Sequence, residues 1–454
     1  MARSGKTDPA LSGFYKKTRG ERLDALKASC SVPVDQLRVL SQDASLSFDL
    51  ANLFVENALG SHPLPLGVVT NVQVNNKNYV VPFAVEESSV IAAASNAAKW
   101  VMQSGGFQSE CLGREMIGQI QILDLNPADF EIIAEKIKAA TVELIDFANL
   151  VHPRLKMRGG GTRSLEVRSF PKSEIPFMVV HVHLDTQEAM GANLVNTVCE
   201  KLAPKIQEII GGRIGLRILT NLADRRLFRA RCEVDFQQLA INDHEYQLSG
   251  LEVARRIHEA YVFAKNDPYR ATTHNKGIMN GVDPLVIATG NDWRAVEAGA
   301  HAFAARSGRY ESLSKWTVDE QKQVLIGELV LPIQLGTVGG ITRLHPTSKA
   351  ALQILGNPSS EELSMICVSC GLASNLSALR ALVTTGIQRG HMKLHAKNLA
   401  LAAGAKPDEV EHVAMELVSR RNVSASAAEA LLESMRNTPE IQSKIPLPHT
   451  NQEL

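Results

Sequence analysis

The sequence predicts an α+β protein in which a small domain interrupts a large mixed domain, followed by a helical C-terminal segment. Three observations lead to this prediction. At 454 residues the chain exceeds the usual size of one hydrophobic core, so two or three domains are expected. The stretch 115–220 alternates strand-like and helix-like patterns as a compact unit. Residues 385–454 are rich in helix-like patterns, which leaves 1–114 and 221–384 as the interrupted large domain.

The individual elements follow from periodicity and from helix stop signals. An alanine-rich helix is expected between a Ser88-Ser89 cap and Gly105-Gly106. Alternating apolar residues predict strands over 119–125, 178–184 and 216–220. Amphipathic helices are expected over 127–148 and over 191–210, the second ending at Gly211-Gly212.

Composition limits the classes of partner. The 48 basic residues equal the 48 acidic ones, so nucleic acid is not expected as the main partner. An anionic ligand must then be held by local basic groups and backbone amides. Residues 1–22 lack the apolar core of a signal peptide. The chain contains no uninterrupted run of roughly eighteen apolar residues, the length that a membrane-spanning helix needs. We therefore expect a cytoplasmic protein without a membrane span.

The six cysteines show no spacing of a secreted disulfide scaffold, which favours a reducing compartment. Cys367-Val-Ser-Cys370 is the one pair with the spacing of a redox or metal half-site. It lies in an apolar, helix-like run without a second pair, so two buried small residues are the favoured interpretation.

Three segments together supply one lysine, two carboxylates and several amide and hydroxyl donors. They are 82–89, 267–281 and 289–294, and they contain Glu87, Lys276 and Asp292. Such a set can reduce a carbonyl, because an ammonium stabilises negative charge on the oxygen and acids supply protons. A fourth segment, 386–392, contains His391, and a histidine can protonate a leaving group near neutral pH.

These four segments closely resemble the class II hydroxymethylglutaryl-CoA (HMG-CoA) reductases, the soluble bacterial and archaeal branch of that family. The resemblance covers nearly the whole chain, except the first dozen residues or so and the tail after about Met435. It implies reduction of HMG-CoA to mevalonate and CoA with two hydrides from NADPH or NADH. It also implies a ferredoxin-like cofactor domain at 115–220, a mobile C-terminal flap, and a homodimer, or a higher oligomer, with active sites at the interface.

The resemblance assigns the catalytic roles. Lys276 is the electrophile for the thioester oxygen, Glu87 is favoured over the adjacent Glu86 as proton donor, and His391 protonates the CoA thiolate. A nearby ammonium and a helix N-terminus both favour an ionised carboxylate, whereas a proton donor must be neutral. The resemblance places Asp292 against the lysine, where two acids can share a proton.

The resemblance also implies contacts to the substrate. Ser89, Arg270 and Asn280 match positions that bind its hydroxymethylglutaryl portion, and a guanidinium suits a carboxylate. Glu56-Asn57 matches a further family signature at the substrate side or the subunit interface. A polar pair at a helix end is an equally good interpretation of those two residues.

For the nicotinamide cofactor, the chain lacks the Gly-x-Gly-x-x-Gly pattern of a Rossmann site. A helix N-terminus can hold a pyrophosphate by its amides, and the resemblance places it at 188–193. His152 stands where NADH-preferring relatives have aspartate, and Arg154 follows, so NADPH is favoured over NADH. A merely solvated basic loop is the other interpretation of these residues. The cofactor-binding residues implied by the resemblance are Glu188, Met190, Gly191, Ala192, Asn193 and Asn221, with His152 and Arg154.

We expect no metal. His391 and His395 have helical spacing but no acidic third ligand, and His181 and His183 fit two same-face strand residues better. Two rival functions stay open at this point. One is mevalonate oxidation by the same site in a catabolic pathway, and the other is a non-catalytic CoA-binding protein.

Overall fold

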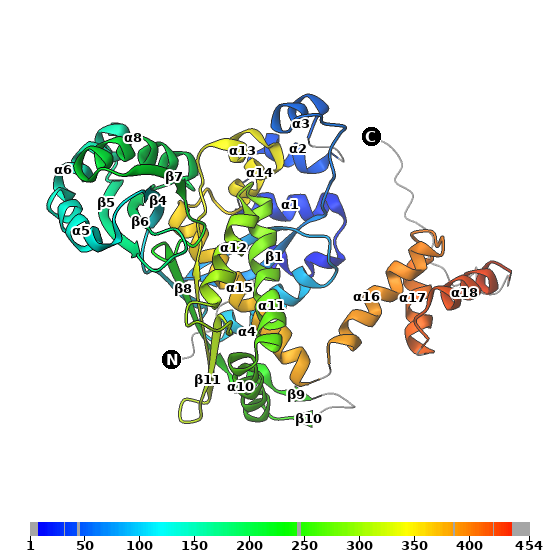
Figure 1. Cartoon of the computed structure of the whole chain (residues 1–454). Coiled ribbons are helices and arrows are strands. Elements are labelled where there is room, and N and C mark those ends of the chain that lie inside the picture. The colour runs from blue at the N-terminus through cyan, green and yellow to red at the C-terminus, as the bar shows by residue number, and fades with distance from the viewer. Residues whose placement is uncertain are drawn as a thin grey trace.

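The computed structural model contains two separate sheets and a group of C-terminal helices that stands apart from the main body (Figure 1). It describes residues 8–30, 32–42, 46–242, 247–384, 386–420 and 422–437, without the side chains of 34 and 387–394. The predicted mixture of helices and sheets is confirmed.

The larger sheet has six strands in the order β11-β12-β8-β3-β1-β2. Its strands are β1 (Leu66–Val74), β2 (Lys77–Ala84), β3 (Phe107–Cys111), β8 (Leu227–Asp235), β11 (Ser314–Asp319) and β12 (Val324–Pro332). All neighbouring pairs are antiparallel except β1 and β3. Strands β3 and β8 are neighbours in this sheet although more than a hundred residues of the chain separate them.

The helices that accompany the large sheet come from the same two stretches of the chain as its strands. They are α1 (Arg19–Cys30), α2 (Val34–Ser41), α3 (Phe48–Phe54), α4 (Val90–Gln103), α9 (Phe236–Leu239), α10 (Gly250–Asn266), α11 (Pro268–Ala288), α12 (Trp293–Ala304), α13 (Gly340–Leu344), α14 (Pro346–Ile354) and α15 (Ser360–Val383). Short 3-10 helices lie at Pro9–Leu11 and Phe14–Lys16, and a small hairpin joins β9 (Ile241–Asn242) to β10 (Gln247–Leu248).

Helix α15 is the centre of the large core. It packs against α4, α11 and several strands, and it contributes Leu363, Ile366, Leu372 and Leu376 to one continuous buried cluster. This helix is long and apolar enough to cross a membrane by length and composition, yet two thirds of its most apolar window is buried inside the protein. Such burial is what a core helix shows. The cysteines of the predicted pair, at 367 and 370, are both buried on it as free thiols.

The smaller sheet has four antiparallel strands in the order β5-β6-β4-β7. Its elements are β4 (Glu115–Leu123), a 3-10 turn (Pro127–Asp129), α5 (Phe130–Ala139), α6 (Thr141–Val151), α7 (Pro153–Met157), β5 (Gly161–Phe170), β6 (Phe177–Asp185), α8 (Ala192–Ile210) and β7 (Arg213–Leu219). The chain therefore runs β-α-β-β-α-β, the connectivity of a split βαβ unit. Helices α5, α6 and α8 bury the apolar side chains of the sheet in a second, separate core.

The predicted helix over 127–148 is wrong in its continuity, because the chain forms two helices there instead of one. Ala140 ends α5 with ψ near 0°. The hydroxyl of Thr141 donates to the carbonyl of Ile137, and such side-chain bonds compete with regular helix formation. The other predicted helices and strands of this region are present within a few residues of their expected ends.

The last described residues form helices α16 (Ile387–Ala402), α17 (Val410–Ser419) and α18 (Ala425–Asn437). They bury a small cluster of their own, which includes Ala400, Val413, Leu417 and Leu432. The helix-rich prediction for this segment is confirmed over these residues, whereas the tail after 437 lies outside the described residues.

A buried polar network holds α11 to β11 and α15. His274 Nε2 lies 2.6 Å from the Ser314 hydroxyl, and Asn375 Oδ1 accepts from Ser314 and from the indole of Trp316. His274 is 2% exposed. Burial, with a smaller effect from Arg270, lowers the pKa of His274 to about 3. The imidazole is therefore neutral in the folded protein.

This network predicts a pH dependence of stability. The unfolded chain takes up a proton on His274 below about pH 6.5, whereas the folded chain does so only near pH 3, so stability is lost as pH falls between these values. In His274→Gln we expect Tm to fall less steeply with decreasing pH between 6.5 and 4, measured by circular dichroism. His62→Gln, at an exposed position, serves as the control. Identical slopes in all three proteins would contradict this account.

Candidate active site

A cavity of about 530 Å³ lies between the loop after β2 and helices α4, α11 and α15. It brings together five residues that the sequence singled out. Glu87 and Ser89 come from the loop and helix start, and Arg270, Lys276 and Asn280 come from α11. Lys276 and Asn280 are four positions apart and so share one face of α11. Arg270 is six positions before Lys276, further around the helix, and it also lines the cavity.

Lys276 and Glu87 form an ion pair inside this cavity, with 2.9 Å between Lys276 Nζ and Glu87 Oε2. The lysine side chain is 60% exposed and that of Glu87 is 37% exposed, so both can reach a ligand. The adjacent Glu86 is exposed and does not line the cavity. Of these two glutamates, the geometry therefore favours Glu87 as the one that faces a ligand.

Ser89 departs from the expected helix cap. Its backbone has φ 77°, in the left-handed region, and its side chain makes no capping hydrogen bond to α4. A non-glycine residue in this region is uncommon and costs free energy, so it is often found where function requires it. The side chain of Ser89 instead contributes to the cavity wall.

Arg270 is the cation best placed for an anionic ligand. It is half-buried in the cavity wall and has no ion-pair partner among the residues that the structure describes. Burial lowers the pKa of its guanidinium, although a group that starts at 12.5 stays charged at neutral pH. A carboxylate that entered the cavity would supply the missing partner.

A second cavity, of about 680 Å³, lies on the smaller sheet's side of the molecule. His152 and Arg154 of the predicted cofactor residues line it, together with Arg158 and the loop after β6 that carries Glu188. The basic loop is thus one wall of a real concavity. No residue lines both this cavity and the one around Lys276.

Helix α8 begins beside the second cavity. Gly191 is its N-cap with φ 103°, and a Cβ atom there would lie 2.4 Å from the Thr186 side chain, so only glycine fits. Met190, Ala192 and Asn193 flank this glycine but do not line the cavity, and neither does Asn221. The backbone amides of Ala192 and Asn193 are in the first turn of α8.

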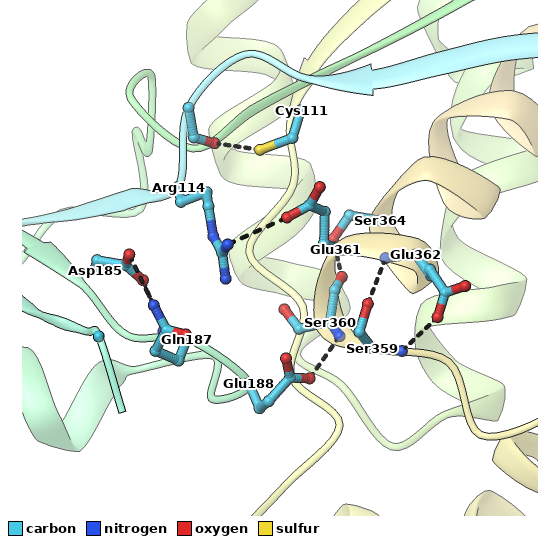
Figure 2. A network of polar contacts seen from close by, with 12 residues as sticks. Cys111, Arg114, Asp185, Gln187, Glu188, Ser359, Ser360, Glu361, Glu362 and Ser364 are labelled. Carbon is cyan, nitrogen blue, oxygen red and sulfur yellow. Dashed lines mark hydrogen bonds and ion pairs between the residues drawn. The ribbon is translucent and has the colours of Figure 1, made fainter. Parts of the chain in front are cut away.

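Glu188 has a structural task that the sequence did not reveal. Its carboxylate accepts hydrogen bonds from the Thr337 hydroxyl at 2.9 Å and from the Ser360 amide at 2.7 Å. Figure 2 shows this carboxylate directed at the first turn of α15, next to the ion pair between Arg114 and Glu361. Glu188 therefore fastens the loop of the smaller sheet to the central helix of the large core.

Arg226 is the main residue that sequence reasoning missed. It is 3% exposed, and its guanidinium donates to Thr186, Ala189 and Met190 of the loop and also to Leu335 and Ser360 of the large core. Burial lowers the pKa of Arg226 to about 10. An arginine one position after another arginine, before a strand, carries no pattern that distinguishes a buried member from an exposed one.

Two predicted catalytic residues are not joined to this pair. The Asp292 carboxylate caps α12 by accepting from the Ala295 amide, and it lies 3.5 Å from Arg294. Lys276 is twelve residues before the end of α11, which corresponds to about 18 Å at 1.5 Å per residue, so Asp292 of the same chain is remote from it. His391 belongs to α16, but its side chain lies outside the described residues.

The comparisons with known proteins identify the family of the chain. A family model described as hydroxymethylglutaryl-coenzyme A reductase matches residues 18–396. The chain belongs to this family.

Individual relatives extend the match to nearly the whole chain. The chain is 44% identical over 443 residues to the 3-hydroxy-3-methylglutaryl-coenzyme A reductase of Archaeoglobus fulgidus, covering 96% of this chain and 98% of that protein. A solved reductase from Streptococcus pneumoniae superposes with a TM-score of 0.79 at 45% identity, covering 94% of this chain and all of that one. A class II reductase structure from the same organism, bound to NADPH, gives 0.78 at 44% identity over 82% of this chain and 99% of that chain.

Membership of the HMG-CoA reductase family identifies the chain as an NAD(P)H-dependent oxidoreductase of the class II type. The hydrogen bonds of Arg226 and Glu188 join the loop of residues 186–190 to the large core, which makes both of them positioning residues for this loop.

Arg226→Lys tests this role. A lysine ammonium cannot reach the loop carbonyls and the Leu335 carbonyl together, so buried acceptors lose their donors. We expect Tm to fall and KM for the nicotinamide cofactor to rise about tenfold, while KM for HMG-CoA changes little. Steady-state kinetics and thermal unfolding measure this. Arg231→Lys, on the strand β8 that follows Arg226 and paired with the partly exposed Glu233, is the control and should behave like the wild type.

Proposed function

We propose that the cavity around Lys276 binds HMG-CoA and that this chain reduces its thioester to mevalonate and CoA with two hydrides from NADPH. The observation that carries the proposal is the Lys276–Glu87 ion pair in a cavity that also holds an unpaired, half-buried Arg270. It combines an electrophile, a carboxyl group and a carboxylate receptor within one concavity of sufficient size for an organic ligand.

The chemistry follows from the charges of these groups. Hydride addition places negative charge on the thioester oxygen, and the Lys276 ammonium stabilises that charge. Glu87, at 2.9 Å from the ammonium, can pass a proton to the same oxygen when the second hydride converts the aldehyde to the alcohol. Arg270 is the proposed partner of the substrate carboxylate, and Ser89 and Asn280 are its proposed contacts to the tertiary hydroxyl.

The second cavity is the proposed NADPH site. NADPH supplies the hydride, and it carries one phosphate more than NADH. His152, Arg154 and Arg158 surround the cavity mouth with basic groups that suit this additional phosphate. A related class II reductase from Streptococcus pneumoniae was solved with NADPH bound, which supports NADPH as the cofactor of this chain. The amides at the start of α8 are the proposed pyrophosphate contacts.

The separation of the two cavities supports a shared active site. Hydride transfer needs reacting atoms within about 3.5 Å, yet the Lys276 cavity and the proposed NADPH cavity have no lining residue in common. Asp292 lies on the side of the second cavity, because its neighbour Asn291 accepts from Gly336, which packs on Met190. A second copy could bring its cofactor loop and its Asp292 together to Lys276.

We therefore propose a homodimer, or a higher oligomer built from it, with one substrate side and one cofactor side at each site. We also propose the division into a large substrate domain at 1–114 and 221–384, a ferredoxin-like cofactor domain at 115–220, and a flap at 385–454 that carries His391. The two sheets with separate cores support this division. Cytoplasmic location is proposed from the resemblance to soluble class II reductases.

Lys276→Ala tests the reductase chemistry. Removing the ammonium should lower kcat about a hundredfold or more, because no other described cation lies on the Glu87 carboxylate. The measurement is oxidation of NADPH and, in parallel, of NADH with HMG-CoA. We expect kcat/KM of the wild type to be higher with NADPH. Lys265→Ala, at an exposed position of α10, should keep full activity. Tight HMG-CoA binding without cofactor oxidation by the wild type would refute the proposed function.

A mixed dimer tests the shared site. Asn193→Glu places a carboxylate at the start of α8, which suits the helix but repels a pyrophosphate, so it should abolish cofactor binding. Coexpression of this variant with Lys276→Ala gives mixed dimers for half of the molecules, each with one intact site of two. We expect about a quarter of wild-type activity in the mixture. Activity no higher than that of either variant alone would show that each site lies within one chain.

A further inference from the structure

Three side chains with metal-binding chemistry lie together on the smaller sheet, outside both cavities. They are Glu166 on β5 and His181 and His183 on β6, and one ligand atom from each lies within 4.8 Å of the others. The register of β5 and β6 pairs Glu166 directly with His181. His183 is two residues further along the same strand and therefore projects from the same face.

His183 provides the strongest evidence for a missing ligand, because it is buried and its ring nitrogens are unpaired in the described part of the chain. It is 1% exposed, and neither ring nitrogen has a hydrogen-bond partner among the described residues. Its Nε2 lies 3.5 Å from the nearer carboxylate oxygen of Glu166. Buried polar groups are nearly always paired, so two unpaired nitrogens beside a carboxylate call for a partner that is missing from the protein itself.

His181 is oriented by its neighbour on the sheet. Its Nε2 lies 3.0 Å from the side-chain amide nitrogen of Gln119, on the neighbouring strand β4. Metal binding through Nδ1 requires the Gln119 amide to be reversed, so that Nε2–H donates to the amide oxygen, the outer partner that metal-ligating histidines commonly have.

The surrounding charges partly oppose a cation. Arg225 Nη2 lies 3.2 Å from the Glu166 carboxylate, and Arg168 is also near His181. Glu166 and Asp224 act in the opposite direction. The Arg225 side chain is 50% exposed, so it can turn into solvent and leave the Glu166 carboxylate to a competing ion.

We propose that Glu166, His181 and His183 form a binding site for one first-row divalent metal ion, with Zn²⁺ as the probe. Two imidazoles and a carboxylate are a donor set that such ions accept, and they leave a coordination position for water. His183 lies three residues before Thr186, so a bound ion would tie β5 to β6 directly ahead of the loop that Arg226 holds. The sequence pattern concealed this site because the third ligand is on the neighbouring strand.

The first test is the binding of Zn²⁺ to the full chain, purified without a histidine tag and stripped with a chelator. We expect one zinc per chain in competition with a chromophoric chelator. Glu166→Gln should weaken binding tenfold or more, and Arg225→Gln should tighten it because the carboxylate is released. The matched control is Glu174→Gln, which makes the same change at an exposed position of the β5–β6 turn and should bind like the wild type.

The second test keeps folding and binding apart. Zn²⁺ should raise Tm of the wild type and of Glu174→Gln but not of Glu166→Gln, since a ligand stabilises only the form that binds it. With Co²⁺ the wild type should show visible absorption bands that Glu166→Gln lacks. Absence of stoichiometric zinc would overturn the proposal. So would equal affinity in Glu166→Gln and Glu174→Gln, because zinc would then be an adventitious ion only.

Discussion

The buried guanidinium of Arg226 is the interaction on which the relation between the two sheets depends. It binds carbonyl and hydroxyl groups of the loop that follows β6 and, at the same time, groups of the large core. Desolvating a cation costs considerable free energy, which is recovered only when every donor is satisfied. A buried arginine of this kind therefore allows few positions for the loop. Glu188 adds a negative partner for the start of α15 on the same loop.

This rigid connection has a consequence for catalysis. If the loop beside the cofactor cavity is fixed to its own large core, small rearrangements of one chain cannot carry it to the distant Lys276 cavity. The exposed faces of Lys276 and Glu87 then have to meet a surface from elsewhere. Exposed ion pairs contribute only about 0–1 kcal/mol to stability, so this pair is better explained by chemistry than by folding. Assembly is the simplest way to complete the site.

The sequence predicted those parts of the molecule that local patterns determine. The helix from 192 to 210 and the strand from 177 to 185 carry strong periodicity. Arg270, Lys276 and Asn280 of α11 were grouped only through the family resemblance. Contacts between distant segments could not be predicted in this way. The bonds of Arg226 span more than a hundred residues to Leu335 and Ser360, and Glu166 meets His183 only through strand register. Ser89 was predicted as a cap because serine usually is one, but its left-handed backbone turns the side chain to the cavity.

The position of Asp292 links the proton requirement of the reaction to assembly. In a single chain Glu87 has the Lys276 ammonium as its near partner. The substrate oxygen needs a proton when the alcohol forms, and a second acid beside Glu87 and Lys276 can share that proton with them. Asp292 of the same chain is too remote, because it caps α12 beyond the end of α11. An aspartate delivered by a second copy would complete the group only when the cofactor side arrives with it. The site would then acquire its proton donor and its hydride source in one step, and an isolated chain would have neither.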